Sequence, residues 1–209
     1  MNIKMASIES LNNKIAINKL FPIFLKLESL QLTIVGGGYV GFEKLNAVLQ
    51  NSPDTAIKLV AKEISSQIRE LAAGYPNIIL IEKPYESNDI EETADIVIAA
   101  VNDPVLSAQV HADAKAKRKL VNVADKPALC DFYLSSVVQK GSVKIAISTN
   151  GKSPTVAKRL KEVLAGLLPD EMESMLDNIH LIRETLKGDF EEKVKQLNDL
   201  TKGLINKNA

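Results

Sequence analysis

Tryptophan is absent from this sequence of 209 residues, which has only four tyrosines and five phenylalanines. A folded core must therefore consist mainly of Ile, Leu, Val and Ala, and the 45% share of hydrophobic residues is enough to build one. The single cysteine, Cys130, excludes an internal disulfide and fits a reducing compartment. Basic and acidic residues are equal in number, whereas a general nucleic-acid binder normally has a basic excess. We therefore expect no nucleic-acid partner.

Long apolar runs are also lacking. No stretch reaches the ~20 consecutive apolar residues that a membrane-spanning helix needs. The first part of the chain contains Lys4 and Lys14 but no compact apolar core ending in small residues, so no signal peptide is predicted. These features predict a cytoplasmic protein with no membrane partner.

Strand-like and helical segments alternate from residue 31 to residue 125. The strand-like segments are apolar throughout, which is typical of a parallel sheet covered on both faces. Five strands are predicted, at residues 31–35, 56–61, 77–83, 94–101 and 119–125. Helices are predicted between them at residues 39–49, 64–76 and 104–117. The segment Ile23–Leu27 could add an edge strand, because Pro22 disfavours a helix there.

The pattern changes after the fifth strand. The stretch "FYLSSVVQKGSVKIAISTNG" predicts two strands joined as a hairpin across Lys140-Gly141. Ser153 is a predicted N-cap for the next helix, with Pro154 at its first position. Residues 170–205 are almost entirely helical in composition. The sequence thus predicts an α/β fold, with a Rossmann-like parallel sheet followed by a small α+β region and a C-terminal helical region.

Three glycines with the spacing G-x-G-x-x-G follow the first of these strands, in "TIVGGGYVGFEKLNAVL". In a dinucleotide site Gly36 permits the tight turn, Gly38 lets the backbone approach the pyrophosphate and Gly41 allows close packing of helix on strand. The helix start also favours the phosphate charge. Three glycines can simply make a tight connection, but their place at the head of a βαβ series favours nucleotide binding.

The acid that usually binds a ribose hydroxyl is expected about 20 residues after the glycines. Glu63 is the nearest acid at the end of the second strand, a residue or two late. Lys62 beside it could indicate a phosphorylated ribose, although a single lysine at a strand end is usually just solvated. The residues themselves therefore leave the choice between NAD and NADP open.

Asp125 comes directly after the fifth strand, in "VNVADKPALCDFYLSS". Ligands of open α/β sheets lie beyond the carboxyl ends of the strands, which would place Asp125 near the nicotinamide. The equal alternative is that Asp125 caps the turn before Pro127, its usual job in an Asp-x-Pro setting. A further segment, "ISTNGKSPTVAKRLKEVL", combines hydroxyls with a basic helix start. That segment either binds carboxylate or phosphate or is an ordinary capped helix with a basic face.

Five stretches occur in the order and spacing of the precorrin-2 dehydrogenase family: "FPIFLKL", "TIVGGGYVGFEK", "AAVNDP", "VNVADKP" and "ISTNGKSPTVAKRLKE". The sequence resembles this family over roughly residues 20 to 170. The family includes the N-terminal module of siroheme synthase and the bifunctional dehydrogenase–ferrochelatase. The resemblance implies NAD-dependent oxidation of precorrin-2 to sirohydrochlorin, on the route to siroheme, with Fe2+ insertion in some members. It also implies a homodimer whose subunits interlock after residue 130.

With this family as a guide, the chain divides into four parts. They are an N-terminal extension (1–19), an NAD-binding Rossmann domain (20–128), a dimerisation and substrate region (129–168) and a C-terminal helical region (169–209).

The resemblance also assigns site residues. Asp125 matches the aspartate implicated in dehydrogenation and, where present, chelation. Asp103 is a cofactor candidate, although a turn with Pro104 explains it equally well. Gly41 stands where alanine is common, a change expected to be harmless or favourable. Cofactor-binding residues are then expected at Gly36, Gly38, Tyr39, Val40, Gly41, Ala61, Lys62, Glu63, Ile64, Asn102 and Asp103.

Precorrin-2 carries many carboxylates, so a chain without net charge must hold it on a local cationic surface. Asp125 can accept the proton that leaves when a hydride goes to the nicotinamide. Because His111, His180 and Cys130 stand apart in the sequence, no resident metal is expected, only a transient Fe2+. Substrate-binding residues are expected at Lys126, Thr149, Lys152, Ser153 and Arg159.

Two other functions are weighed against this one. A non-catalytic NAD-sensing domain would keep the glycine turn but has no use for Asp125 or the "ISTNGKSP" segment. A chelatase that has lost dehydrogenation would not need the intact glycine turn. The sequence does not separate a dehydrogenase with one activity from a dual-activity enzyme, because Asp125 would serve both.

Overall fold

A computed structural model describes residues 18–186 and 189–202 of the chain. The chain forms two compact units, a first unit, Met1–Leu134, and a second unit, Ser135–Ala209. The predicted N-terminal extension, 1–19, lies almost wholly outside the described residues. No helix within the two described ranges is long and apolar enough to cross a bilayer.

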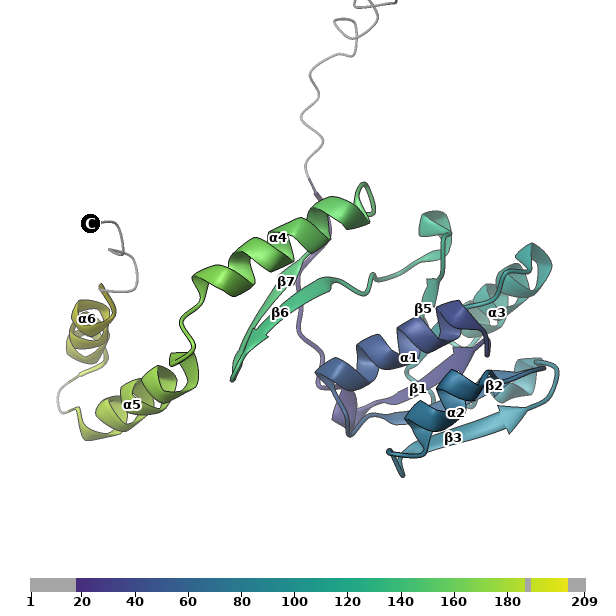
Figure 1. Ribbon diagram of the computed structural model, residues 1–209, viewed down its shortest axis with the longest axis horizontal. Coiled ribbons are helices and arrows are strands. Elements are labelled where there is room, and N and C mark those ends of the chain that lie inside the picture. The colour runs from purple at the N-terminus through teal and green to yellow at the C-terminus, as the bar shows by residue number, and fades with distance from the viewer. Residues whose placement is uncertain (1–17, 187–188, 203–209) are drawn as a thin grey trace, which may run out of the picture. The chain divides into compact units, whose positions relative to one another are not determined.

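The first unit contains a five-stranded sheet in the order β3-β2-β1-β4-β5 (Figure 1). Every neighbouring pair is parallel, which confirms the predicted α/β fold with a Rossmann-like sheet. Its central strand β1 ends at the glycine turn, between β2 and β4. The strands are β1 (Gln31–Val35), β2 (Ala56–Ala61), β3 (Ile78–Glu82), β4 (Ile96–Ala99) and β5 (Leu120–Val123).

Helices cover both faces of this sheet because alternate strand residues point to opposite sides. Ile34 of β1 packs with α1 (Tyr39–Asn51) and α2 (Ser66–Ala72), in a cluster that includes Leu45 and Ile68. Val35, one residue later, packs in the opposite cluster with α3 (Pro104–Ala116). The strands are therefore buried on both sides, as their continuous apolar sequences predict.

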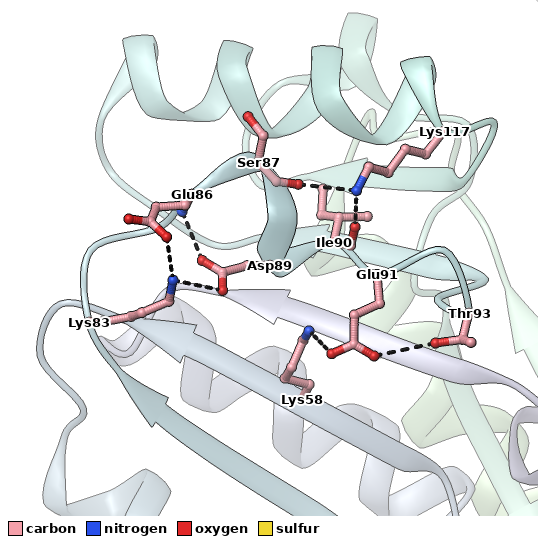
Figure 2. Close-up of polar contacts among 9 residues, drawn as sticks. All are labelled: Lys58, Lys83, Glu86, Ser87, Asp89, Ile90, Glu91, Thr93 and Lys117. Atoms are coloured by element: carbon pink, nitrogen blue, oxygen red, sulfur yellow. Dashed lines mark hydrogen bonds and ion pairs between the residues drawn. The ribbon is translucent and has the colours of Figure 1, made fainter.

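The connection from β3 to β4 has no α-helix and instead contains a 3-10 helix, η2 (Ser87–Asp89). Three lysines make polar contacts with or within this connection (Figure 2). Lys58 of β2 pairs with Glu91, and Lys83 pairs with both Glu86 and Asp89. The ammonium of Lys117 donates to backbone carbonyls of the connection at Ser87 and Ile90. These polar contacts add to the apolar packing of the connection, whose Ile90 and Ala94 are buried in the core cluster that also contains α3 residues.

The predicted edge strand at Ile23–Leu27 is wrong. Residues 18–26 have no regular structure, and Leu27–Ser29 forms a 3-10 helix, η1. Pro22 cannot donate to a strand ladder. The side chains of Phe21 and Phe24 are exposed, so their burial does not offset the entropy lost by fixing an extended strand.

The second unit begins with the predicted hairpin, whose strands β6 (Ser136–Lys140) and β7 (Val143–Ile147) are antiparallel. The register pairs Lys140 with Val143 and leaves a two-residue loop, in which Gly141 has a φ of 54° that favours glycine. α4 (Pro154–Leu167) packs on the hairpin and begins at the predicted cap, Ser153. α5 (Met172–Thr185) and α6 (Phe190–Thr201) follow and confirm the helical C-terminal region.

Glu173 of α5 ties this helix to the tip of the hairpin. Its carboxylate accepts from the backbone N–H of Ser142 and, at 2.7 Å, from the Ser142 hydroxyl. These hydrogen bonds lower the pKa of Glu173. The contribution of Glu173 to stability is therefore complete above the ordinary glutamate pKa of about 4.3, and is lost as the pH falls through the lower folded value.

We expect Glu173→Gln to make the second unit less stable near neutral pH and less sensitive to acid. A neutral amide keeps the shape of the side chain but removes its charge, so acid has less to titrate. Thermal unfolding followed by circular dichroism from about pH 7 to about pH 3 measures this, with Glu184→Gln as the control on the same helix. Equal acid sensitivity in the two variants would contradict a role for Glu173.

Candidate functional site

A cavity of about 870 Å³ opens at the carboxyl edge of the sheet in the first unit. Its lining comes from the segments that follow β1, β2, β3, β4 and β5, and from the first turns of α1 and α3. Ligands of open α/β sheets bind at this edge, and the volume is in the range of small-molecule sites. Predicted residues in the lining are Gly36, Gly38, Tyr39, Val40, Ala61, Lys62, Glu63, Asn102, Asp103 and Asp125.

The glycine turn is packed tightly against its neighbours in the protein. Gly36 has a φ of 127°, and a Cβ built on it would lie 2.2 Å from the carbonyl oxygen of Ala100. Its N–H donates to the Val60 carbonyl oxygen at 2.9 Å. A Cβ on Gly41 would lie 2.2 Å from the Gly36 oxygen. Gly36 and Gly41 are therefore required by the packing of strand, turn and helix, as the G-x-G-x-x-G spacing predicts.

Gly38 is different because a Cβ built on it meets nothing within 4 Å. It is the N-cap of α1, and no side chain caps this helix start. The first N–H groups of an α-helix have no partner within the helix, and the helix dipole favours an anion there. An open backbone facing a cavity at an uncapped helix start fits the pyrophosphate of a dinucleotide.

The end of β2 presents Lys62 and Glu63 to the cavity. Both are exposed, and neither side chain has a hydrogen bond or ion pair with any residue that the structure describes. Ile64, by contrast, is 8% exposed and packs in the core with α1 and α2, and does not line the cavity. Its N–H donates to a carboxylate oxygen of Glu82, which lowers the pKa of Glu82.

Asp103 lines the cavity and also caps α3. Its carboxylate accepts from the N–H of Val105 at 2.8 Å and of Leu106 at 3.3 Å, while Pro104 occupies the first helical position. The turn with Pro104 that the sequence offered as one alternative is therefore present. Asn102 lines the cavity immediately before this cap.

Asp125 lies at the carboxyl end of β5 in a left-handed conformation, with a φ of 57°. The turn is closed by the N–H of Lys126, which donates to the Val123 carbonyl oxygen. The Asp125 side chain is exposed and has no hydrogen-bond partner among the described residues. The alternative that Asp125 caps the turn before Pro127 is wrong, because η3 (Pro127–Leu129) has Lys126 as its N-cap and no side-chain cap.

An unpartnered carboxylate in a strained backbone conformation is a feature of functional sites. Non-glycine residues rarely have positive φ, although aspartate tolerates this conformation better than most. The carboxylate of Asp125 is free to accept a proton from a ligand in the cavity. Lys126 beside it donates instead to the Pro104 carbonyl oxygen at 3.4 Å, and so braces the start of α3.

The remaining predicted site residues lie in the second unit, at the start of α4. The Thr149 hydroxyl donates to the Ser153 carbonyl oxygen and accepts from the Ser153 N–H, both at 3.2 Å. The Ser153 hydroxyl accepts from the N–H of Val156 and caps α4. Arg159 pairs with Glu162 at 2.7 Å, and Lys152 is exposed.

Sequence reasoning missed eleven residues that also line the cavity. Tyr85 follows β3, and the rule that sites lie at strand ends would have found it. Gln109 lies on the second turn of α3, where nothing in the sequence distinguishes it from a solvated helix residue. The missed residues are Val35, Gly37, Val60, Pro84, Tyr85, Ala100, Val101, Val105, Leu106, Gln109 and Ala124. Among the residues that the structure describes, no group of three or more His, Cys, Asp or Glu could hold a metal ion.

Two protein families match this chain. The family described as "Putative NAD(P)-binding" matches residues 23–136, and the family described as "Sirohaem biosynthesis protein central" matches residues 140–167. The chain is 31% identical over 176 residues to the siroheme synthase of Mannheimia succiniciproducens, covering 84% of this chain and 34% of the relative. It is 35% identical over 191 residues to the siroheme synthase of a Psychrobacter species, covering 85% and 38%. The chain thus spans little more than a third of the length of these relatives.

A solved structure of SirC, a precorrin-2 dehydrogenase, has the same fold. The TM-score is 0.68 at 22% sequence identity, and the superposition covers 90% of this chain and 93% of that one.

Proposed function

The chain belongs to the precorrin-2 dehydrogenase family, which includes the N-terminal module of siroheme synthase, and from this premise we propose that it oxidises precorrin-2 to sirohydrochlorin with NAD+. The observation that carries the proposal is the unpartnered carboxylate of Asp125 in the same cavity as the open glycine turn. A domain that only sensed the nucleotide would not need an unpartnered carboxylate in a strained conformation at the position of Asp125.

The residues of the first unit divide the work of this reaction. NAD+, when bound, supplies the acceptor for a hydride. Gly38 and the start of α1 hold the pyrophosphate, with Tyr39 and Val40 beside it. Ala61, Lys62 and Glu63 would contact the adenosine half, and Asn102 and Asp103, which follow β4, would complete the cofactor site. The Asp125 carboxylate accepts the proton that the macrocycle loses, so that each oxidation releases one hydride and one proton.

Substrate carboxylates would be held by cationic and hydroxyl side chains. Lys152 is exposed and available to a substrate, whereas Arg159 would have to exchange Glu162 for a substrate carboxylate. Lys126, beside the proposed base, would likewise leave the Pro104 carbonyl oxygen. Thr149 and Ser153 complete this candidate set at the start of α4.

Anaerobic incubation of the purified chain with precorrin-2 and either NAD+ or NADP+ tests the proposal. We expect sirohydrochlorin and reduced nucleotide to appear in equal amounts, measured by absorbance. Addition of Fe2+ after completion tests chelation in the same sample. Nucleotide binding without oxidation of precorrin-2 would favour a sensing domain and overturn the proposed activity.

We further propose that the chain forms a homodimer through α4. Four apolar side chains lie along one side of this helix at helical spacing, and each is at least 44% exposed. They are Val156, Leu160, Val163 and Leu167. Exposed apolar stripes of this kind mark interaction sites. A second copy of the chain, which presents the same stripe, can cover them in a symmetric interface.

Leu160→Glu is expected to weaken this dimer about 100-fold, because it places an unpaired charge in an apolar interface at a cost of about 3 kcal/mol. Sedimentation at several protein concentrations measures the dissociation constant. Lys158→Glu places the same charge on the opposite side of α4 and should leave the dimer intact. A wild-type chain that sediments as a monomer, or equal effects of the two substitutions, would contradict the proposal.

A further inference from the structure

Tyr85 forms part of the cavity wall at the end of β3. Its side chain is partly buried, and its hydroxyl donates to the Oδ2 atom of Asp113 on α3 at 2.9 Å. The hydroxyl of Ser87 donates to the same oxygen at 2.8 Å. Burial and the neighbouring Asp113 carboxylate raise the pKa of Tyr85, so its hydroxyl remains a donor. The ring is thus held at one end by a charge-assisted hydrogen bond.

The backbone that carries Tyr85 is fixed from both sides. Lys83, two residues before it, pairs with Glu86 and Asp89, and the N–H of Glu86 donates to Asp89 at 2.8 Å (Figure 2). Lys117 of α3 donates to the carbonyl of Ile90. Asp89 is 7% exposed, so its interactions are little screened by solvent. A side chain on such a segment loses little further freedom when a ligand packs against it.

The strand order defines which part of a dinucleotide would reach Tyr85. The glycine turn follows the central strand β1, Asp125 follows the edge strand β5, and Tyr85 follows the opposite edge strand β3. If the pyrophosphate lies over β1 and the nicotinamide lies toward Asp125, the adenine at the other end of the dinucleotide must extend over β2 toward β3. The lining of the cavity includes residues after both strands, Lys62 and Glu63 after β2 and Pro84 and Tyr85 after β3.

We propose that Tyr85 is the positioning residue for the adenine base, which packs on its ring. The only other tyrosine of the lining, Tyr39, is the first residue of α1, next to the glycine turn that would hold the pyrophosphate. An aromatic face is the surface on which bases stack. The inference rests on the proposed use of a dinucleotide, and it assigns recognition of the adenine to Tyr85, anchored through Asp113.

Calorimetric titration of the purified full chain with NAD+, ADP-ribose and nicotinamide mononucleotide tests this assignment, because only the first two ligands carry adenine. Tyr85→Leu keeps apolar bulk and should weaken NAD+ and ADP-ribose about 10-fold or more while sparing the mononucleotide. Tyr85→Phe keeps the ring and should bind within a few-fold of wild type. Tyr133→Ala, a tyrosine outside the cavity lining, is the control, and thermal unfolding of each variant reports on folding.

Undiminished binding of ADP-ribose by a folded Tyr85→Leu variant would overturn the inference and leave the proposed oxidation standing. Equal weakening of all three ligands would also overturn it, since the effect would then not depend on adenine. A chain that binds NAD+ through Tyr85 but does not oxidise precorrin-2 would support the inference and overturn the proposed function.

Discussion

Replacing Asp125 with asparagine is expected to lower the rate of precorrin-2 oxidation by about 10²- to 10⁴-fold, the usual contribution of a general base. The amide has nearly the same shape as the carboxylate but cannot accept the proton that leaves the macrocycle. Asparagine also tolerates the left-handed conformation that Asp125 adopts, so the backbone of the turn should not change. Affinity for NAD+ and thermal stability should therefore remain as in wild type.

Two further variants distinguish loss of the proton acceptor from a change in the folded structure. Asp125→Gly relieves the positive φ and removes the carboxylate, so it should be as inactive as Asp125→Asn and no less stable in the turn. Asp54→Asn, at an exposed aspartate outside the cavity lining, is the control and should retain the activity. Single-turnover oxidation under anaerobic conditions measures all three variants. Turnover of Asp125→Asn at the wild-type rate would show that another group takes the proton.

The second large effect is expected in the glycine turn, where substitution at one position should lower stability and substitution at another should lower NAD+ affinity. Gly36→Ala places a Cβ 2.2 Å from the Ala100 carbonyl oxygen at a φ of 127°. Strain and overpacking together should lower the free energy of unfolding by about 3 kcal/mol or more. The substitution should destabilise the first unit whether or not a nucleotide is present.

Gly38→Ala should instead leave the fold intact and weaken NAD+ about 10-fold or more. The added Cβ meets no protein atom within 4 Å, but it stands where the pyrophosphate would approach the start of α1. The expected loss of NAD+ affinity corresponds to the loss of one or more charge-assisted hydrogen bonds to the pyrophosphate. Chemical denaturation and calorimetric titration of both variants test the pair. A stable Gly36→Ala variant, or Gly38→Ala with wild-type NAD+ affinity, would contradict this division of roles.

Much of the first unit could be predicted because buried parallel strands have a strong sequence signal. Each strand is a short apolar run between turns. Because ligands of such sheets bind at the carboxyl ends of the strands, the residues that follow each predicted strand are candidate site residues. The glycine spacing and Asp125 were found in this way. The same rule applied to β3 would have found Tyr85, but the sequence "EKPYE" has no pattern that draws attention to it.

Other features could not be predicted because local sequence does not determine them. Asp-x-Pro is compatible both with a capping aspartate and with a free one, and only the hydrogen bonds of the folded turn, in which no side chain caps η3, separate the two. The segment Ile23–Leu27 has strand composition, yet a strand needs a partner and a buried face that composition does not specify. Ile64 follows the end of β2 like its neighbours Lys62 and Glu63, but its side chain turns into the core.

The glycine turn also has a consequence for how this sequence can change over evolutionary time. Gly36 and Gly37 each face a backbone oxygen about 2 Å from where a side chain would begin, so the fold itself disfavours replacement. Gly38 faces open space, and only a bound ligand would forbid replacement there. In a descendant that lost its nucleotide, selection would relax at Gly38 first, while Gly36 and Gly37 persisted. A side chain at this position is therefore the mark by which such a descendant could be identified from its gene alone.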